Sequence, residues 1–557
     1  MEFNGAQMII HLLERQGIKI LFGIPGGANL PIYEALYHSN LRHILARHEQ
    51  GAGFIAQGMA RSTGRVAVCM ATSGPGATNL LTAIADAKLD SVPMVAITGQ
   101  VPAPLIGTDA FQEVDTYGLT LPITKHNFLV QDTEELLEVI PEAFRIAQSG
   151  RPGPVVVDVP KDIQARTMDV QRWPDPAQAA PLPECDGSII SRMADMIHQA
   201  ERPVFYIGGG VIAADAAEVL KQLARKNTIP VTSTLMGLGA VAHDDPLFLG
   251  MLGMHGNAQT NVIMARADLI IALGIRFDDR ATGKIEEFCP GAAIIHVDVD
   301  PSEIDKLKNA TLGVCGDVKE ILTRLLPEIK NDERKAWQGD MAALKPSRAF
   351  ACPESKDMNH PASIIRFIGD FVPEDTIITT DVGQHQMWTA QPYPFRHPMT
   401  FLTSGGLGTM GFGLPAAIGA ALAHPDQKIV CISGDGSFLM NLQELATLAE
   451  NRLNIAIVIL NNGHLGLVRQ QQELFYDNHI FASRFDTSPD FAAIARGFGV
   501  MAVDLAQAND PKRALAKALA QPGPCLIHAK VHSQLNVYPM VPPGASNLEM
   551  IGGNNHV

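Results

Sequence analysis

The chain has 557 residues, 46% of them hydrophobic, which is enough material for the buried cores of three or four domains. Its 43 Lys and Arg face 58 Asp and Glu, a net charge of −15 at pH 7 that argues against nucleic-acid binding. The sequence has no membrane-spanning stretch, no secretory leader and no CxxC pair among its seven cysteines, so we expect a cytoplasmic protein with free thiols and no membrane partner.

Three segments of alternating strands and helices follow one another. Residues 1–19 have the pattern of an amphipathic helix, and apolar β-branched runs then begin at Val66, Pro93, Val155, Pro203, Asp268, Ala293, Lys428 and Ile455. The amphipathic stretches between them predict an α/β fold of three doubly wound, parallel-sheet domains. We place these domains at residues 1–165, 187–330 and 360–535, with linkers at 172–187 and 330–358 and a tail at 536–557.

The first and third segments have the same order of predicted elements. In each, a helix of small residues (51–64 and 411–426) leads to a strand, a Gly-rich loop (73–79 and 433–437), a helix and another strand. We interpret them as two related folds, whose facing edges would suit a cofactor with two ends.

In the first segment, Glu49 follows an apolar strand and begins the small-residue helix. A buried carboxylate here could share a proton with a nitrogen base at neutral pH. The alternative is a solvated glutamate that stabilises the helix dipole. The loop Ser73–Asn79 would form another wall of the same site, or be an ordinary turn that caps a helix.

In the second segment, Gly208, Gly209 and Gly210 follow a strand, which is weak evidence for a dinucleotide site. In the third, Asp435 and Asn462 lie 27 residues apart, each after an apolar strand. Both would reach the carboxyl edge of one sheet, where their oxygens suit magnesium and a diphosphate. Gly436 and a helix from Ser437 would approach the anion; the alternative is two plain turns.

Longer strings cover nearly the whole chain and are similar to the large, catalytic subunit of acetohydroxyacid synthase (acetolactate synthase). They include RHEQGAGFIAQG (47–58), GTDAFQEVD (107–115), RFDDR (276–280), TSGGLGTMGFGLPAAIGA (403–420) and VPPGASN (541–547). The resemblance implies that pyruvate is decarboxylated and joined to pyruvate or 2-ketobutyrate, the first common step of branched-chain amino acid synthesis. It also implies thiamine diphosphate, Mg²⁺, a non-redox FAD, a homodimer or homotetramer, and a small regulatory subunit.

Site residues are implied where the strings match. Catalytic roles fall on Glu49, Gln112, Lys161 and Arg280, metal binding on Asp435, Asn462 and the backbone of His464, and substrate binding on Phe111 and Gln471. Thiamine diphosphate would contact Gly26, Thr72, Pro75, Asn79, Val382, Gln384, His385, Met410, Gly436, Ser437, His464, Gly466 and Val468. FAD would contact Arg151, Gly208, Gly209, Gly210, Met254, His255, Gly274, Arg276, Asp298 and Asp317. Within these sets, Met410 would wedge between the cofactor's rings, and Gly26, Phe111, Gln112 and Lys161 would come from a second subunit.

Two residues bear on the second substrate. Arg280 would anchor its carboxylate through a bidentate pair, unless it forms a structural ion pair with Asp278 or Asp279. Gln471 stands where many family members have a Trp that contacts the extra methyl of 2-ketobutyrate. We therefore expect a weak preference for 2-ketobutyrate and acetolactate as the main product.

Three other functions compete with this one. Glyoxylate carboligase shares the fold but has an apolar residue in place of the activating glutamate, so Glu49 disfavours it. An FAD- or NAD-binding oxidoreductase would explain the glycine loops but would leave Glu49 and the Asp435–Asn462 pair unused. An inactive homologue would have no need to keep those three residues intact.

Overall fold

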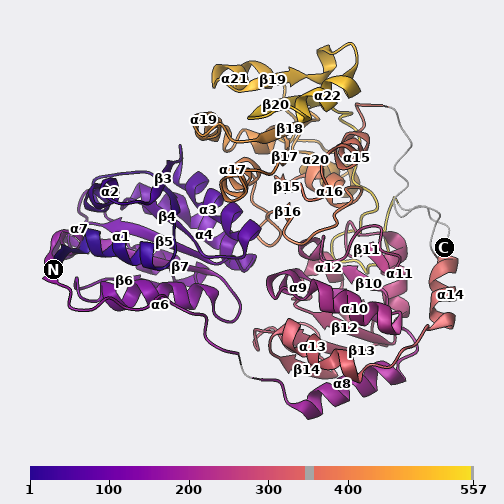
Figure 1. Ribbon diagram of the computed structural model, residues 1–557. Coiled ribbons are helices and arrows are strands. Elements are labelled where there is room, and N and C mark those ends of the chain that lie inside the picture. Colours follow the sequence, from indigo (N-terminus) through magenta and orange to yellow (C-terminus); the bar gives the residue numbers. More distant parts are fainter. Residues whose placement is uncertain (183, 345–356, 553–557) are drawn as a thin grey trace.

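The structure, a computed structural model, describes residues 1–182, 184–344 and 357–552. Three six-stranded parallel sheets, each with helices packed against it, follow one another along the chain (Figure 1). The α/β prediction is therefore confirmed, and each sheet lies within one of the three predicted segments. Every apolar run named above is a strand, and the predicted N-terminal helix is α1.

The first sheet has the strand order β3-β2-β4-β5-β7-β6. Its strands are β2 (Ile20–Gly23), β3 (Arg42–Leu45), β4 (Ala67–Ala71), β5 (Met94–Gln100), β6 (His126–Leu129) and β7 (Pro154–Pro160). The helices are α1 (Gly5–Arg15), α2 (Leu30–Tyr37), α3 (Glu49–Thr63), α4 (Pro75–Leu89), α5 (Thr116–Thr120), α6 (Leu136–Gln148) and α7 (Lys161–Ala165). A short antiparallel pair that the sequence did not predict joins β1 (Glu2–Asn4) to β8 (Thr167–Asp169).

The third sheet has the order β16-β15-β17-β18-β20-β19, which is the order of the first sheet strand for strand. It comprises β15 (Ile377–Thr380), β16 (Phe401–Leu402), β17 (Ile429–Gly434), β18 (Ile455–Asn461), β19 (Met501–Asp504) and β20 (Cys525–Lys530). Its helices are α15 (Pro361–Phe371), α16 (Gln384–Ala390), α17 (Gly413–Ala423), α18 (Asp435–Phe438), α19 (Leu445–Glu450), α20 (Gly466–Phe475), α21 (Phe491–Gly497) and α22 (Pro511–Leu519). The shared order confirms that the two domains are related folds.

The second sheet differs, with the order β11-β10-β9-β12-β13-β14. Its strands are β9 (Pro203–Ile207), β10 (Val231–Ser233), β11 (Phe248–Met251), β12 (Leu269–Leu273), β13 (Ala293–Asp298) and β14 (Leu312–Cys315). The helices are α8 (Gly187–Gln199), α9 (Gly209–Ala213), α10 (Ala217–Asn227), α11 (Ala258–Arg266), α12 (Asp279–Thr282), α13 (Val318–Glu328) and α14 (Lys335–Leu344). The strand order reverses between β9 and β12, a switch point of the kind at which dinucleotides bind in doubly wound sheets.

Helices α3 and α17 cross where the first and third domains meet (Figure 1). A Cβ atom on Gly58 would lie 2.0 Å from the Ala416 carbonyl oxygen, and one on Gly419 would lie 1.9 Å from that of Ile55. Only glycine fits at either position, so the two backbones touch. One hydrophobic cluster continues through this contact from the first domain into the third.

The stretch 330–358 is only partly the linker that we predicted. Residues 335–344 form helix α14, which buries Trp337 and holds its indole N–H 3.2 Å from the Pro203 carbonyl oxygen. Arg334 is also buried and donates to the carbonyl of Ile197 at 2.7 Å. The middle domain thus extends into this segment by burying its few apolar side chains, although the composition of the segment is polar. Residues 345–356 lie outside the described ranges.

The tail packs against the middle domain. The amide of Val541 donates to the Met254 carbonyl at 2.9 Å, and that of Lys284 donates to Ala545 at 3.0 Å. The Asn547 side chain donates to the carbonyl of Ala281 at 2.8 Å. The tail therefore contacts Met254 and the residues that directly follow 276–280.

Two further expectations concern the whole chain. Among the described residues, no helix is long and apolar enough to cross a membrane. Six described cysteines are free thiols, as predicted, and five of them are buried; Cys352 lies outside the described ranges.

Candidate active site

Glu49 is the first residue of α3, and its carboxylate faces the Gly-rich loop that follows β4. The side-chain amide of Asn79 donates to Glu49 Oε2 at 2.9 Å. A Cβ atom on Gly76 would lie 3.5 Å from Glu49 Oε1, so the start of α4 passes close by. Within one chain Glu49 is half-buried, less than the sequence argument required. The loop 73–79 is thus the wall that the sequence predicted beside Glu49.

Thr72 joins this wall to the loop after β2. A Cβ atom on Gly26 would lie 2.5 Å from the Thr72 methyl carbon, and one on Gly76 would lie 2.8 Å from it. The Thr72 hydroxyl accepts from the amide of Ala28 at 3.2 Å. Gly26, Thr72 and Glu49, predicted separately, therefore lie in one continuous patch, whereas Pro75 is exposed at its margin.

Tyr33 lies near Glu49 and is paired with His43, and neither residue was predicted from the sequence. The Tyr33 hydroxyl lies 3.0 Å from His43 Nε2. Burial, with the nearby Glu49 charge, raises the pKa of Tyr33 well above its usual range. Burial also lowers the pKa of His43 to about 4. The two side chains thus form a neutral pair beside the carboxylate, and no local sequence pattern marks them.

Glu444 was also missed, although it reaches Glu49's segment from the third domain. Its Oε1 accepts the backbone amides of Arg47 at 2.8 Å and His48 at 3.1 Å. Its Oε2 accepts the Thr447 hydroxyl at 2.7 Å. The residue is fully buried, and burial raises the pKa of its carboxyl. Glu444 therefore holds the two residues that precede the candidate catalytic glutamate.

Phe111, Gln112 and Lys161 lie at the same carboxyl edge of the first sheet. Phe111 is 88% exposed and Lys161 is also exposed, so nothing within the described part of one chain covers them. Gln112 has a positive φ of 60°, and its backbone approaches within 2.9 Å of where a Gly74 Cβ would be. The loop bends around Glu113, which accepts backbone amides including that of Ala110 at 3.1 Å.

Asp435 and Asn462 meet at the carboxyl edge of the third sheet, as predicted. Gly434 pairs with Leu460 in the β17–β18 ladder, so Asp435 leaves its strand opposite Asn461, the residue before Asn462. Asp435 Oδ2 accepts the Gly463 amide at 2.8 Å, and burial raises the pKa of Asp435 to about 6. The Asn462 amide nitrogen donates to Gln384 Oε1 at 2.9 Å, which leaves Asn462 Oδ1 directed away from Gln384.

This donor set fits magnesium rather than a softer metal. Within residues 1–182, 184–344 and 357–552, no three His, Cys, Asp or Glu side chains gather as a metal site. A metal at Asp435 would therefore use one carboxylate, one amide oxygen, a backbone carbonyl such as that of His464, and oxygens of a ligand. The His464 backbone lies beside the pair, its amide donating to Asn462 Oδ1 at 3.1 Å.

The remaining diphosphate residues surround this pair. His385 is buried, its Nε2 finds no hydrogen-bond partner among the described residues, and burial lowers its pKa to about 3. The Ser437 hydroxyl donates to the Val382 carbonyl at 2.8 Å. A Cβ on Gly466 would lie 2.3 Å from Gln384 Oε1, so any larger residue there would displace the Gln384 side chain. The neutral His385 ring carries one proton for its two nitrogens, so Nε2 can donate to a diphosphate oxygen in the tautomer that protonates Nε2.

The helix start at this site differs from the expectation. The helix expected from Ser437 begins at Asp435 and lasts a single turn. Gly436 packs under Leu465 and Phe485, whose nearest atoms would be 2.8 and 3.0 Å from an added Cβ. The close approach of a phosphate at Gly436 stays a prediction.

Met410 is half-buried in the loop that enters α17. Asp381 Oδ1 accepts the amides of Gly411 at 2.8 Å and Gly413 at 3.0 Å, so the residues just after Met410 are held to the end of β15. Val382 and Gln384 come directly after Asp381 in the sequence.

On α20, Val468 and Gln471 are both exposed and lie three residues apart, so they share one open face of the helix.

The predicted glycines of the middle domain meet at its switch point. A Cβ on Gly210 would lie 2.5 Å from the Gly274 Cα atom, and one on Gly208 would lie 2.4 Å from the Gly274 carbonyl oxygen. Burial raises the pKa of Asp298, at the end of β13, to about 6. Asp317 caps α13 by accepting the Glu320 amide at 2.8 Å. These residues lie at the carboxyl edge of the sheet, where the backbones at Gly210 and Gly274 approach closely.

The other residues predicted for FAD lie around this edge, with Gly209 beginning α9. His255 is buried, and burial lowers its pKa to about 4. Arg151 reaches the middle domain from the first domain, its guanidinium 2.6 Å from Glu303. Arg276 is half-buried.

Arg280 is exposed and lies next to Met254. Its guanidinium is 3.6 Å from the carboxylate of Asp279, which is the alternative pair that the sequence left open. Both partners are largely exposed, so this pair is weak and leaves the guanidinium available to a ligand. The Met254 amide donates to the Arg280 carbonyl at 2.8 Å.

Known proteins match this chain along nearly its whole length. The chain matches three families, described as the thiamine pyrophosphate enzyme N-terminal TPP binding domain (residues 3–119), central domain (190–325) and C-terminal TPP binding domain (381–529). It is 56% identical over 553 residues to the acetolactate synthase isozyme 1 large subunit of Escherichia coli (strain K12), covering 99% of this chain and 98% of the relative. It is 47% identical to the isozyme 2 large subunit of the same organism (98% and 99%) and 46% identical to the acetolactate synthase large subunit of Parasynechococcus marenigrum (strain WH8102) (99% and 91%).

Proposed function

Because the chain belongs to the acetolactate synthase large subunits of the thiamine pyrophosphate enzymes, we propose that it decarboxylates pyruvate and joins the two-carbon fragment to a second 2-keto acid. The observation that carries the proposal is the position of Glu49 at the start of α3, with Asn79 fixing one carboxylate oxygen. Glyoxylate carboligase, the nearest alternative, would have an apolar residue at that position.

Thiamine diphosphate, when bound, supplies the electron sink for decarboxylation. Glu49 would hold a proton at the cofactor's aminopyrimidine N1′, and Asn79 would keep the acceptor oxygen oriented. Asp435 and Asn462 would hold Mg²⁺ through side-chain oxygens and His464 through its carbonyl, while His385, as the Nε2–H tautomer, would donate to the diphosphate. Pairing of Gln384 with Asn462 supports this assignment, because it fixes the amide group so that its oxygen, which also accepts the His464 amide, keeps a lone pair for the metal.

The second substrate would meet Arg280, Phe111 and Gln471. Arg280 would pair with its carboxylate, supported by an exposed guanidinium that is only weakly engaged by Asp279. Gln471, exposed on α20, offers no aromatic surface for the ethyl group of 2-ketobutyrate. We therefore propose 2-acetolactate as the main product and 2-aceto-2-hydroxybutyrate as the minor one, in the pathway to valine and isoleucine.

We propose that the middle domain binds FAD without using its redox chemistry, since the overall reaction transfers no net electrons. The strand-order reversal between β9 and β12, and the contact of Gly208 and Gly210 with Gly274, support a dinucleotide site there. The half-buried guanidinium of Arg276 would suit a phosphate.

Two copies of the chain would complete the site. Phe111, Gln112 and Lys161 stand at an open sheet edge, and Glu49 is only half-buried, which supports a second subunit covering that edge in a homodimer or homotetramer. The relatives are named large subunits, which supports a small regulatory partner. The cytoplasmic location stays a prediction from the sequence.

The test is reconstitution of purified protein with pyruvate, thiamine diphosphate and Mg²⁺, with and without FAD. Acetolactate formed only with all components is the expected result, and Glu49→Gln should abolish it. The control is Glu142→Gln, which removes a carboxylate from the exposed face of α6. Hydride transfer to an acceptor would favour an oxidoreductase, condensation of glyoxylate alone would favour the carboligase, and no reaction at all would favour an inactive homologue.

A further inference from the structure

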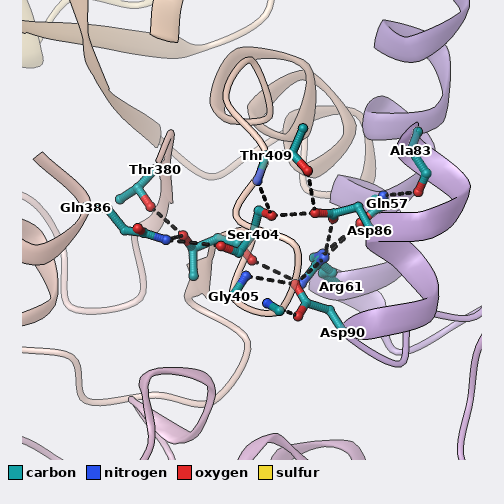
Figure 2. Close-up of polar contacts among 12 residues, drawn as sticks. Gln57, Arg61, Ala83, Asp86, Asp90, Thr380, Gln386, Ser404, Gly405 and Thr409 are labelled. Atoms are coloured by element: carbon teal, nitrogen blue, oxygen red, sulfur yellow. Dashed lines mark hydrogen bonds and ion pairs between the residues drawn. The ribbon is translucent and has the colours of Figure 1, made fainter. Parts of the chain in front are cut away.

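A buried cluster of one arginine and two aspartates lies between the first and third domains. Arg61 of α3 places its guanidinium 3.0 Å from Asp86, on α4, and 2.8 Å from Asp90, the residue that follows α4 (Figure 2). The Arg61 side chain is 7% exposed and the two aspartate side chains are fully buried. Two carboxylates thus face one guanidinium in a site closed to water, and one negative charge needs other donors.

Those donors come from a loop of the other domain. Asp90 accepts the backbone amides of Gly405 at 2.9 Å and Gly406 at 2.7 Å. Asp86 accepts the hydroxyls of Thr409, at 3.1 Å, and Ser404. Figure 2 shows these contacts reaching from α4 to the loop. The loop 404–411 is therefore anchored at its beginning and middle by the first domain.

Further bonds lock the same stretch internally. The Ser404 hydroxyl also accepts the Thr409 amide at 2.8 Å, which closes the loop on itself. Arg61 donates to the Thr403 carbonyl at 3.1 Å, and Gln386 of α16 donates to the Ser404 carbonyl at 3.1 Å. The stretch that precedes Met410 is thus tied to buried partners at Thr403, Ser404 and Thr409.

Met410 lies between two carboxylate anchors. On its N-terminal side Asp86 and Asp90 hold residues 404–409, and on its C-terminal side Asp381 holds the amides of Gly411 and Gly413. Buried charge is a costly way to pack two domains, since apolar side chains of similar size often serve as well. Directional anchoring of one loop, in contrast, is what charged hydrogen bonds do well.

We propose that Asp86 and Asp90 are positioning residues of the active site, which fix from the first domain the loop that carries Met410 in the third. The inference rests on the proposed function, because it takes Met410 to contact the thiamine cofactor. The two aspartates touch neither cofactor nor substrate; they act through the loop. Cofactor binding to the third domain then depends on the intact contact between α4 and residues 404–409.

The experiment uses Thr409→Val and Asp90→Asn in the full chain, with Asp245→Asn as the matched control. Asp245 is a buried carboxylate that also pairs with one arginine, Arg225 at 2.9 Å, but it lies in the middle domain. The thiamine diphosphate dissociation constant is measured by titration, the near-ultraviolet circular dichroism of bound cofactor reports its conformation, and melting temperatures are taken without cofactor.

We expect Thr409→Val to raise the dissociation constant about tenfold, the effect of losing one hydrogen bond to a charged group, and Asp90→Asn to raise it further. Thr409→Val should lower the cofactor-free melting temperature only modestly, because valine fills the volume of threonine and Asp86 keeps its bonds to Ser404 and Arg61. Asp245→Asn should lower the melting temperature without changing cofactor affinity.

Unchanged affinity in Thr409→Val and Asp90→Asn would overturn the inference, as would an equal loss of affinity in Asp245→Asn. Should Asp90→Asn fail to fold, Thr409→Val decides the question alone. Wild-type protein that binds no thiamine diphosphate would overturn the proposed function itself. Normal wild-type binding with unaffected variants would overturn only the positioning role.

Discussion

Replacement of Glu444 tests whether the third domain positions Glu49. In Glu444→Ala, the backbone amides of Arg47 and His48 lose their acceptor, at 2.8 and 3.1 Å in the native protein. In Glu444→Gln, the amide oxygen can still accept both, and the new NH₂ group can donate to the Thr447 hydroxyl. The two variants therefore separate loss of the acceptor from loss of charge.

The structure sets the size of each effect. An unpaired buried amide costs about 1–3 kcal/mol, and both amides are partly buried, so Glu444→Ala should destabilise the domain contact by about 2–4 kcal/mol. Glu444→Gln loses only the charged character of the bonds, about 1 kcal/mol. A Cβ on Gly51 would be 2.4 Å from Glu444 Oε1, so this side chain fills its space and its removal leaves a cavity.

The functional effect follows from the position of Glu49, the residue after His48. A shift of about 1 Å in a catalytic group can cost roughly 100-fold in rate. We expect Glu444→Ala to slow proton exchange at C2 of bound thiamine diphosphate about 100-fold, and Glu444→Gln to slow it only a few-fold. Rapid-quench NMR measures this exchange, and calorimetry measures the stability change.

The control is Glu450→Gln. Glu450 pairs with the Arg47 side chain from the same helix as Thr447, but it is exposed, so both exchange rate and stability should stay close to wild type. Wild-type exchange in Glu444→Ala would refute the positioning argument. An equal loss in Glu444→Gln would show that the charge, and not the acceptor geometry, is what matters.

Three further predictions concern other parts of the molecule. Gly419→Ala places a methyl 1.9 Å from the Ile55 carbonyl oxygen, so we expect loss of folded protein or a large drop in melting temperature; wild-type stability would mean that α3 and α17 do not touch in solution. Burial raises the pKa of Asp158 to about 7, above its unfolded value of 3.8. The contribution of Asp158 to the free energy of unfolding is therefore complete below pH 3.8. It is lost as the pH rises towards 7, at up to about 1.4 kcal/mol per pH unit. Asp158→Asn should remove that slope from the difference between variant and wild-type unfolding curves, and parallel curves would contradict the burial argument. Gln471→Trp should raise the ratio of 2-aceto-2-hydroxybutyrate to acetolactate about tenfold in a competition assay, whereas a strong bias to 2-aceto-2-hydroxybutyrate in the unaltered protein would show that Gln471 does not set the preference.

Local patterns were enough for the fold class and for the strand-end residues. Runs such as those at Lys428 and Ile455 are apolar on both faces and separated by helical stretches, and only parallel sheets covered by helices bury such runs. Asp435 and Asn462 end neighbouring strands, so their meeting at one edge follows from strand geometry. The wrong detail there, the helix at Ser437, reflects the difficulty of placing a helix start from residue types alone.

Contacts between distant segments were beyond such reasoning. Arg334 and Trp337 sit in a polar stretch, and their burial depends on the middle domain surface that they happen to meet. The tail at 541–547 has a composition typical of a loose end, yet it lies along the middle domain through backbone bonds that any sequence could form.

The sequence by itself determined the parallel-sheet architecture, the two related domains and the residues at each strand end, because all of these depend on periodicity and neighbours within one segment. Only the tertiary structure decided which side chains hold those residues in place. Glu444 reaches Arg47 across 397 positions, and Ser404 reaches Asp86 across 318. Both contacts exist because α3 and α17 cross at two glycines, and the angle at which two helices pack is set by the fit of their surfaces in space, which no local pattern records.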